Sequence, residues 1–383
     1  MGTLVFYPWL RLKKEYSFGY YRLIPYKRGK LPAGAGSETQ KQIDKVTKPY
    51  VLAPGEPIVE ATLLQIGNGG VVGDLGEAER ESAFEFSELL AVSGLSCRDF
   101  FRWDYWNKDN FRVVIQGFTD HEFVSFKSRR KDGSSTQGWT IKSYQVLKPE
   151  HVDVNCSPNI DADLLNSLLK ARTLPEWVDY WGAIVYYNLS NTDNIEIDQR
   201  VEVVLAIGAF ESLLSTRGTG EALGDRFEEI LKPMTDLPMN SCAQLSDATR
   251  FKKSVTVRHI WVRDFYNLRS KLAHGELGHK YPAIWSTRNH LLLASHAFPL
   301  VLKCLLGKQG IYQLTDEDRL RSNVFEKLAC KDHFGQVKNH SVPDEYPWNQ
   351  VIQEEREEDV KRRMVETLSK MRMQKSDEEN PEV

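Results

Sequence analysis

Asp264-Phe-Tyr-Asn-Leu-Arg269-Ser-Lys-Leu-Ala-His274-Gly275 is the most informative segment of the 383-residue chain. Apolar residues in and before it recur at the three- and four-residue spacing of a helix packed on a core. They are Val257, Trp261, Phe265, Leu268 and Leu272. A glycine directly after such a stripe is a frequent helix stop. The segment therefore predicts an amphipathic helix that ends near His274.

An arginine and a histidine in this helix point to chemistry on a phosphodiester. A histidine moves protons near neutral pH, because its unperturbed pKa is about 6.5. An arginine holds a phosphate with paired donors and stabilises the charge that develops on it. At about 100° per residue, His274 nevertheless lies about 140° around the helix from Arg269. The two side chains converge only if the helix distorts at Gly275, or if a second copy of the helix completes the site.

Basic residues are concentrated around this pair. Residues 250–280 include eight Lys or Arg and two acidic residues, whereas the whole chain has a formal net charge of −3. A local positive field is what a phosphate-backbone ligand needs. A solvated helix face whose partners lie elsewhere in the fold explains the charges equally well. On the first interpretation, the expected RNA-binding residues are Lys252, Lys253, Arg258, Arg263 and Lys271.

Composition is that of a soluble globular protein, with 41% hydrophobic and 27% charged residues. The five cysteines form no C-x-x-C pair, so we expect reduced intracellular thiols and neither a disulfide framework nor a zinc site. The N-terminus lacks a signal-peptide pattern. The apolar run Leu291–Leu306 is too short for a membrane span, and we expect a buried helix that Pro299 kinks or divides. These features predict a cytoplasmic protein without a membrane segment, cofactor or metal.

Periodicity predicts an α+β fold. Residues 1–150 form a β-rich domain in this prediction, because Phe111–Phe118 and Glu122–Phe126 alternate apolar and polar side chains. The other features expected in this region are a hairpin turn at Asp132-Gly133, a loop over 31–57, a helix over Glu77–Leu90 and a linker over Pro149–Asn159.

From residue 161 the period becomes helical, which predicts an all-α domain over 161–306 and a C-terminal extension over 307–383. Asp161 is its expected first N-cap. Ile197–Leu214 has two apolar faces with Glu211 between them, so this helix is either central in a core or shared with a partner chain. The charged helix Glu354–Gln374 either packs on a partner or lies in solvent. Its narrow apolar stripe consists of Val360, Met364, Leu368 and Met371.

Three segments resemble, in order, the helices of the HEPN superfamily (higher eukaryotes and prokaryotes nucleotide-binding), in its Apea-like branch. They are Ala206–Leu214 with Glu211, Asp225–Leu231, and the Arg-x4-His-Gly helix Phe265–Gly275. The resemblance covers residues 161–306 and implies an all-α bundle that dimerises along its signature helices. Many active members have Asn, Asp or His after the arginine. Ser270 in this position agrees better with the Apea-like branch.

The resemblance implies a metal-independent endoribonuclease of antiviral (abortive infection) or toxin-like defence. His274 would act as general base on a ribose 2′-hydroxyl or as acid on the leaving 5′-oxygen. Arg269 would stabilise the transition state. Glu211 would position one of the two, or equally would be a partly buried glutamate paired with a core arginine. Some members only bind nucleotides or partners, so the alternative is a non-catalytic dimeric scaffold for nucleic acid, nucleotide or protein. In the ribonuclease, residues 1–150 would sense a trigger ligand or protein or would restrain the activity.

Other motifs favour structural roles. The glycine-rich Ile66–Gly73 lacks the third glycine and the Lys-Ser/Thr of a nucleotide site, which indicates a loop between strands. His279, His290 and His296 lack the spacing of metal ligands. The aromatic run Phe100–Trp106 is either a base-stacking platform or, more commonly, core packing.

Overall fold

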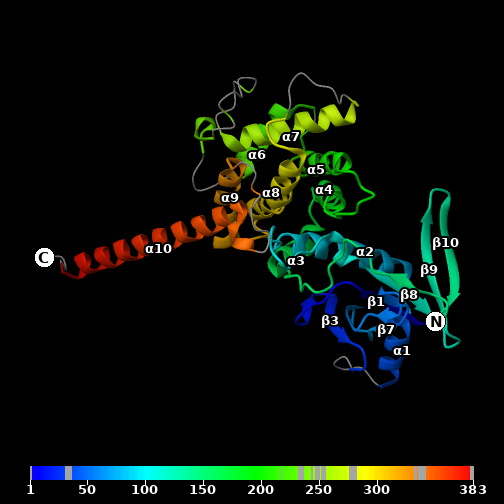
Figure 1. Cartoon of the computed structure of the whole chain (residues 1–383). Coiled ribbons are helices and arrows are strands. Elements are labelled where there is room, and N and C mark those ends of the chain that lie inside the picture. Colours follow the sequence, from blue (N-terminus) through cyan, green and yellow to red (C-terminus); the bar gives the residue numbers. More distant parts are fainter. Residues whose placement is uncertain are drawn as a thin grey trace. The chain divides into compact units, whose positions relative to one another are not determined.

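The computed structural model describes residues 2–30, 37–216, 218–231, 237–242, 245, 251, 256–275, 283–331, 334 and 342–379. This part of the chain divides into two compact units (Figure 1). The first comprises Met1–Asp99 and Asp104–Leu213, and the second comprises Phe100–Trp103 and Leu214–Val383. The fold is α+β, with an antiparallel sheet in the N-terminal region and mainly helices after it, as predicted. The division after Leu213 falls inside the range 161–306 that periodicity assigned to one helical domain.

An antiparallel sheet is central to the first unit, with strand order β10-β9-β8-β1-β6-β3-β2 and with β7 paired to β1. Its strands are β1 (Gly2–Tyr7), β2 (Tyr16–Phe18), β3 (Tyr21–Lys27), β6 (Glu60–Ile66), β7 (Val72–Gly73), β8 (Val114–Phe118), β9 (Phe123–Arg130) and β10 (Gly133–Thr140). A small sheet has the order β11-β4-β5. It consists of β4 (Tyr50–Ala53), β5 (Glu56–Pro57) and β11 (Val146–Leu147). The predicted hairpin turn at Asp132-Gly133 joins β9 to β10 and is confirmed.

Helices α1 (Ser37–Thr47) and α2 (Glu77–Leu95) pack against the sheet. Successive residues of β1 point to opposite faces. Phe6 belongs to the core cluster that includes Ile43 of α1. The hydroxyl of Tyr7 is instead hydrogen-bonded to Ser87 Oγ of α2 at 2.8 Å. The predicted helix from Glu77 is confirmed and extends to Leu95.

The predicted loop over residues 31–57 is wrong for most of its described part, because α1, β4 and β5 occupy residues 37–47, 50–53 and 56–57. Residues 31–36 lie outside the described residues. Ile43 and Val46 are 0% and 1% exposed. Their burial stabilises a helix in a segment whose polar composition indicated a loop, so tertiary packing overrides local propensity here.

The segment 149–159, predicted as a linker, is packed within the first unit. Val152 and Val154 belong to its core cluster. The ammonium group of Lys148 donates to the Val152 carbonyl at 2.6 Å. The linker prediction is wrong because alternate apolar residues of this irregular segment are buried, although Pro and Asn suggested an exposed connection.

Three helices complete the first unit. They are α3 (Ala162–Ala171), α4 (Trp177–Leu189) and α5 (Gln199–Leu213). The Asp161 carboxylate accepts from the Leu164 N–H at 2.9 Å, which confirms the predicted N-cap. On α5, Val203 and Ile207 are fully buried, whereas Val201 on the second apolar face is 50% exposed. One of the two predicted faces of α5 is therefore core, and the other is only partly covered.

The second unit is helical. Its helices are α6 (Gly220–Ile230), α7 (Val257–Ala273), α8 (Thr287–Lys308), α9 (Asp316–Ala329) and α10 (Pro347–Glu379), with short 3-10 turns at Met239–Ser241 and Pro343–Glu345. Trp261 of α7 is at the centre of the core. Its ring lies 5.6 Å from that of Phe227 on α6 and 5.1 Å from that of Phe325 on α9. The aromatic contacts thus join three helices around one buried indole.

Cys242 and Cys330 form a disulfide in this unit, with their Cα atoms 5.0 Å apart. The prediction of reduced thiols is wrong for this pair. The two cysteines are 88 residues apart in sequence, and only the fold brings them within bridging distance.

Helix α8 is the only described helix that is long and apolar enough to cross a membrane, and 72% of its most apolar window is buried in the protein. Most of this window is therefore part of the protein core. Pro299 lies inside α8 and does not divide it. Helix α10 starts earlier and ends later than predicted. Its apolar stripe at Val360, Met364, Leu368 and Met371 is 54–63% exposed.

Candidate functional site

Helix α7 carries the predicted arginine and histidine, and its C-terminal end is accessible. His274 is the C-cap residue, and its backbone N–H donates to the Ser270 carbonyl at 3.1 Å. Gly275 follows with φ +69°, a left-handed conformation that favours glycine and ends the helix. The His274 side chain is exposed. The predicted helix and its glycine stop are therefore confirmed.

The N-terminal half of α7 is deeply buried. Ile260, Trp261, Val262 and Phe265 are each 0% exposed. Leu268 and Leu272 belong to the same predicted stripe but are only partly buried. The helix thus anchors in the core through its first half and leaves apolar surface on its second half, next to the candidate site.

Arg258 was expected to bind RNA, and the structure contradicts this. Its Nη1 atom donates to Glu326 Oε1 of α9 at 2.8 Å, and the two side chains are only 4% and 1% exposed. Glu228 of α6 lies 3.7 Å from the same guanidinium. The charge count over residues 250–280 did not include these two carboxylates, because they belong to other helices.

The other expected RNA-binding residues differ in how exposed they are and in whether the structure describes them. Lys252 and Lys253 lie outside the described residues. The guanidinium of Arg263 lies 5.1 Å from the centroid of the Phe251 ring, a cation–π distance. Lys271 is partly buried on the C-terminal half of α7. Because Arg258 is buried, the basic residues do not form a continuous surface along the described part of α7.

Arg269 and His274 do not converge through a distortion of α7, because the helix is regular through Ala273. The Arg269 guanidinium lies 5.8 Å from the centroid of the Tyr266 ring. The Tyr266 hydroxyl in turn donates to the Gly218 carbonyl at 3.2 Å. In a regular helix, side chains five positions apart point about 140° from each other. The helix therefore does not show the distortion that a site within one chain requires, and a site completed by a second copy of the helix stays a prediction.

Glu211, the third expected catalytic residue, lies on α5 in the first compact unit and is partly buried. Arg269 and His274 lie in the second unit. Its expected role beside one of them stays a prediction.

Two hydrogen-bonded polar pairs that position α7 were missed from sequence. Asp264, 1% exposed, accepts from the Ile284 backbone N–H at 2.7 Å and is hydrogen-bonded to His290 at 3.2 Å. Burial lowers the pKa of His290, although the Asp264 carboxylate acts in the opposite direction. His259 of α7 is hydrogen-bonded to Asp225 of α6 at 3.0 Å. The signal for both was a charged or imidazole side chain among apolar helix residues of α7, because a polar group that is buried there needs a hydrogen-bond partner.

In the described residues, no group of three or more His, Cys, Asp or Glu side chains is arranged to hold a metal ion. Of the three histidines assigned structural roles, His290 is buried against Asp264, and His296 is hydrogen-bonded to the Arg321 carbonyl. His279 lies outside the described residues. The aromatic run is split, because Phe100 and Trp106 are buried whereas Trp103 is 70% exposed.

Comparison with models of protein families, with curated proteins and with solved structures finds no match to this chain.

Proposed function

We propose that this protein is a metal-independent endoribonuclease of HEPN type, which acts in antiviral or toxin-like defence. The proposal is carried by the position of His274, exposed at the C-terminal cap of α7 with Arg269 on the preceding turns. This is the Arg-x4-His-Gly arrangement of the resemblance, on an exposed helix end that an RNA strand can approach.

In the proposed reaction, the imidazole of His274 takes the proton from a ribose 2′-hydroxyl or gives one to the leaving 5′-oxygen. The attacking 2′-oxygen forms a bond to phosphorus as the bond to the 5′-oxygen breaks. Arg269 stabilises the negative charge on the non-bridging oxygens. The products are a 2′,3′-cyclic phosphate and a 5′-hydroxyl, so a DNA strand is not cleaved. Glu211 is assigned an orienting role within this proposal.

The proposed active form is a homodimer in which Arg269 of one copy and His274 of the other form each site. The regular geometry of α7 supports this arrangement, because it separates the two side chains within one copy. The partly buried Leu268 and Leu272 offer apolar area for such a contact. The remaining RNA contacts are assigned to Arg263 and Lys271.

We place the enzyme in the cytoplasm, where its RNA substrates are. The disulfide between Cys242 and Cys330 argues for an oxidising compartment instead. Differential alkylation of the cysteines in intact cells decides between the two.

The first test compares RNA cleavage in the presence of EDTA by the wild type and by Arg269→Ala and His274→Ala. Matched controls are Arg319→Ala and His121→Ala, which alter exposed residues elsewhere. Because the purified enzyme can be held inactive, the same variants are expressed in cells, and growth and RNA integrity are followed. Loss of cleavage in the two site variants alone supports the proposal. Full activity in both contradicts it, and RNA binding without cleavage in any assay supports the scaffold alternative.

The second test mixes the two inactive variants. Co-expression of Arg269→Ala and His274→Ala generates mixed dimers that retain one complete site, so about a quarter of wild-type activity returns if chains pair at random. A site formed within one chain leaves the mixture inactive. The result separates a composite site from a single-chain site without further structural work.

A further inference from the structure

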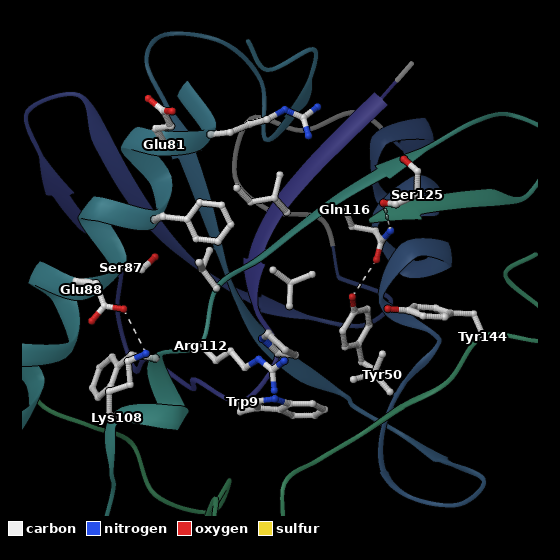
Figure 2. A pocket seen from close by; sticks show the side chains of 18 of the residues that line it. Trp9, Tyr50, Glu81, Ser87, Glu88, Lys108, Arg112, Gln116, Ser125 and Tyr144 are labelled. Carbon is white, nitrogen blue, oxygen red and sulfur yellow. Dashed lines mark hydrogen bonds and ion pairs between the residues drawn. The ribbon is translucent and has the colours of Figure 1, made fainter. Parts of the chain in front are cut away.

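A cavity of about 560 Å³ opens in the first unit between α2 and β8 (Figure 2). Its volume is in the range of small-molecule sites. β9 pairs with β8 only at Gly117 and Phe118. Among the described residues, no strand pairs with residues 114–116 on the edge of β8 that faces away from β1. The cavity lies at this open edge of the sheet.

One wall of the cavity is held by a chain of hydrogen bonds. The Tyr50 hydroxyl donates to Gln116 Oε1 at 2.9 Å, and Gln116 Nε2 donates to the Ser125 carbonyl at 2.7 Å (Figure 2). Tyr50 and Gln116 are 2% and 1% exposed. Tyr144 lies beside Tyr50, with the two ring centroids 6.3 Å apart. The wall is thus polar, and two hydrogen bonds hold its side chains in place.

Arg112 supplies an available positive charge at this wall. Its side chain is exposed, and no described carboxylate forms an ion pair with it. Burial raises the pKa of Tyr50 and of Tyr144, while the Arg112 charge acts in the opposite direction on both. The guanidinium is therefore close to two hydroxyls that stay protonated at neutral pH. Because the Tyr50 proton is donated to Gln116, the Arg112 guanidinium is the donor at this wall that can bind a ligand anion.

The other cations of the cavity are engaged. Lys108 forms an ion pair with Glu88 at 3.2 Å, and Nε of Arg80 donates to the Leu75 carbonyl at 3.1 Å. Phe84 of α2 is 54% exposed and lines the same cavity. An exposed phenyl ring in a cavity provides a surface on which a flat ring can stack.

We propose that this cavity binds a small aromatic anion, with a phosphate or carboxylate on Arg112 and a flat ring against Phe84. The planar guanidinium matches the paired oxygens of either group. The inference concerns the first unit and does not depend on the proposed nuclease, so His274→Ala binds the ligand as the wild type does.

Calorimetric titration of the full-length protein tests the ligand class. The probes are 5′-AMP and indole-3-acetate, which carry a ring and an anion, and adenosine and inorganic phosphate, which carry one feature each. At least one of the first two binds about tenfold or more tightly than adenosine and phosphate. Binding of 5′-AMP alone assigns a phosphate, and binding of indole-3-acetate alone assigns a carboxylate. No binding of either at millimolar concentration, or equal binding of adenosine, overturns the proposal.

Two variants locate the bound probe. Arg112→Gln weakens binding about ten- to a hundredfold, because it removes a charge-assisted hydrogen-bond pair. Phe84→Ala weakens the binding of the aromatic anions and leaves the binding of inorganic phosphate unchanged. Both side chains are exposed, so both variants fold, which thermal melting checks. Arg200→Gln, at an exposed arginine of the same unit outside the cavity, is the matched control and binds as the wild type does. Unchanged binding in both Arg112→Gln and Phe84→Ala contradicts the proposal.

Discussion

Replacement of Arg258 by Met provides a direct test of how α7 is held in the second unit. Arg258 and Glu326 form an ion pair at 2.8 Å, with side chains 4% and 1% exposed. Removing one partner leaves the other charge buried and uncompensated, which costs about 3–5 kcal/mol. We therefore expect the free energy of unfolding of Arg258→Met to fall by this amount. Urea denaturation followed by circular dichroism measures it.

The double variant Arg258→Met/Glu326→Leu separates the loss of the pair from the loss of packing. It removes both charges, so most of the stability returns. Glu326 also accepts from the Leu237 backbone N–H, and the double variant does not recover that contribution. Lys271→Met, on the more exposed half of the same helix, is the control and changes stability by less than about 1 kcal/mol.

The opposite outcome would identify Arg258 as a phosphate ligand. In that case Arg258→Met keeps its stability, lowers RNA affinity and reduces the salt dependence of binding by about one charge. Such a result refutes the assignment of Arg258 to the core of the second unit. It would restore the expectation that the whole of α7 is a basic surface.

Three further changes test other parts of the fold. Burial, with Asp193 and Asp198 nearby, raises the pKa of Glu202 to about 7 from 4.5, so the protonated form favours folding and this stabilisation is lost as pH rises from 5 to 8. Glu202→Gln should make the melting temperature less dependent on pH over that range, and an unchanged pH profile contradicts the assignment. Cys242→Ser opens a disulfide that closes an 88-residue separation, and under non-reducing conditions we expect a loss of about 4–5 kcal/mol; an unaltered urea midpoint would exclude the bond. In Gly224→Ala the new Cβ would lie 2.8 Å from Nε2 of the buried His259, and the overpacking cost of about 1–3 kcal/mol exceeds the helix-propensity gain of about 1 kcal/mol. A higher unfolding midpoint for this variant would show that the α6–α7 contact can relax.

Much of the secondary structure could be predicted from local patterns. The apolar stripe that begins at Val257 predicted α7, and Gly275 predicted where this helix ends. Asp161 was predicted as the N-cap of the helix that is now α3. These features depend on residues a few positions apart, for which backbone geometry is the deciding physics. The segment 37–47 could not be predicted this way, because α1 is stabilised by the burial of two apolar side chains against a distant sheet.

The candidate site was predictable in its residues but not in its surroundings. Arg269 and His274 were found from motif and spacing, and the angle between them follows from helix geometry. The partners of Arg258, the role of Asp264 and the cavity at Arg112 involve residues from separate elements. The spacing of residues along the chain does not predict these contacts, because each one joins side chains from different helices or strands.

The sequence by itself determined the α+β class, the extent and end of α7, and the positions of the arginine and histidine on it. These depend on periodicity and on the conformational freedom of glycine, which act over one or two turns of the chain. Only the tertiary structure decided which basic residues are available, since Glu228 and Glu326 approach Arg258 from other helices. It also decided that Cys242 meets Cys330 and that the edge of β8 is open. Charge pairing and burial are properties of neighbours in space, and the fold brings these neighbours together.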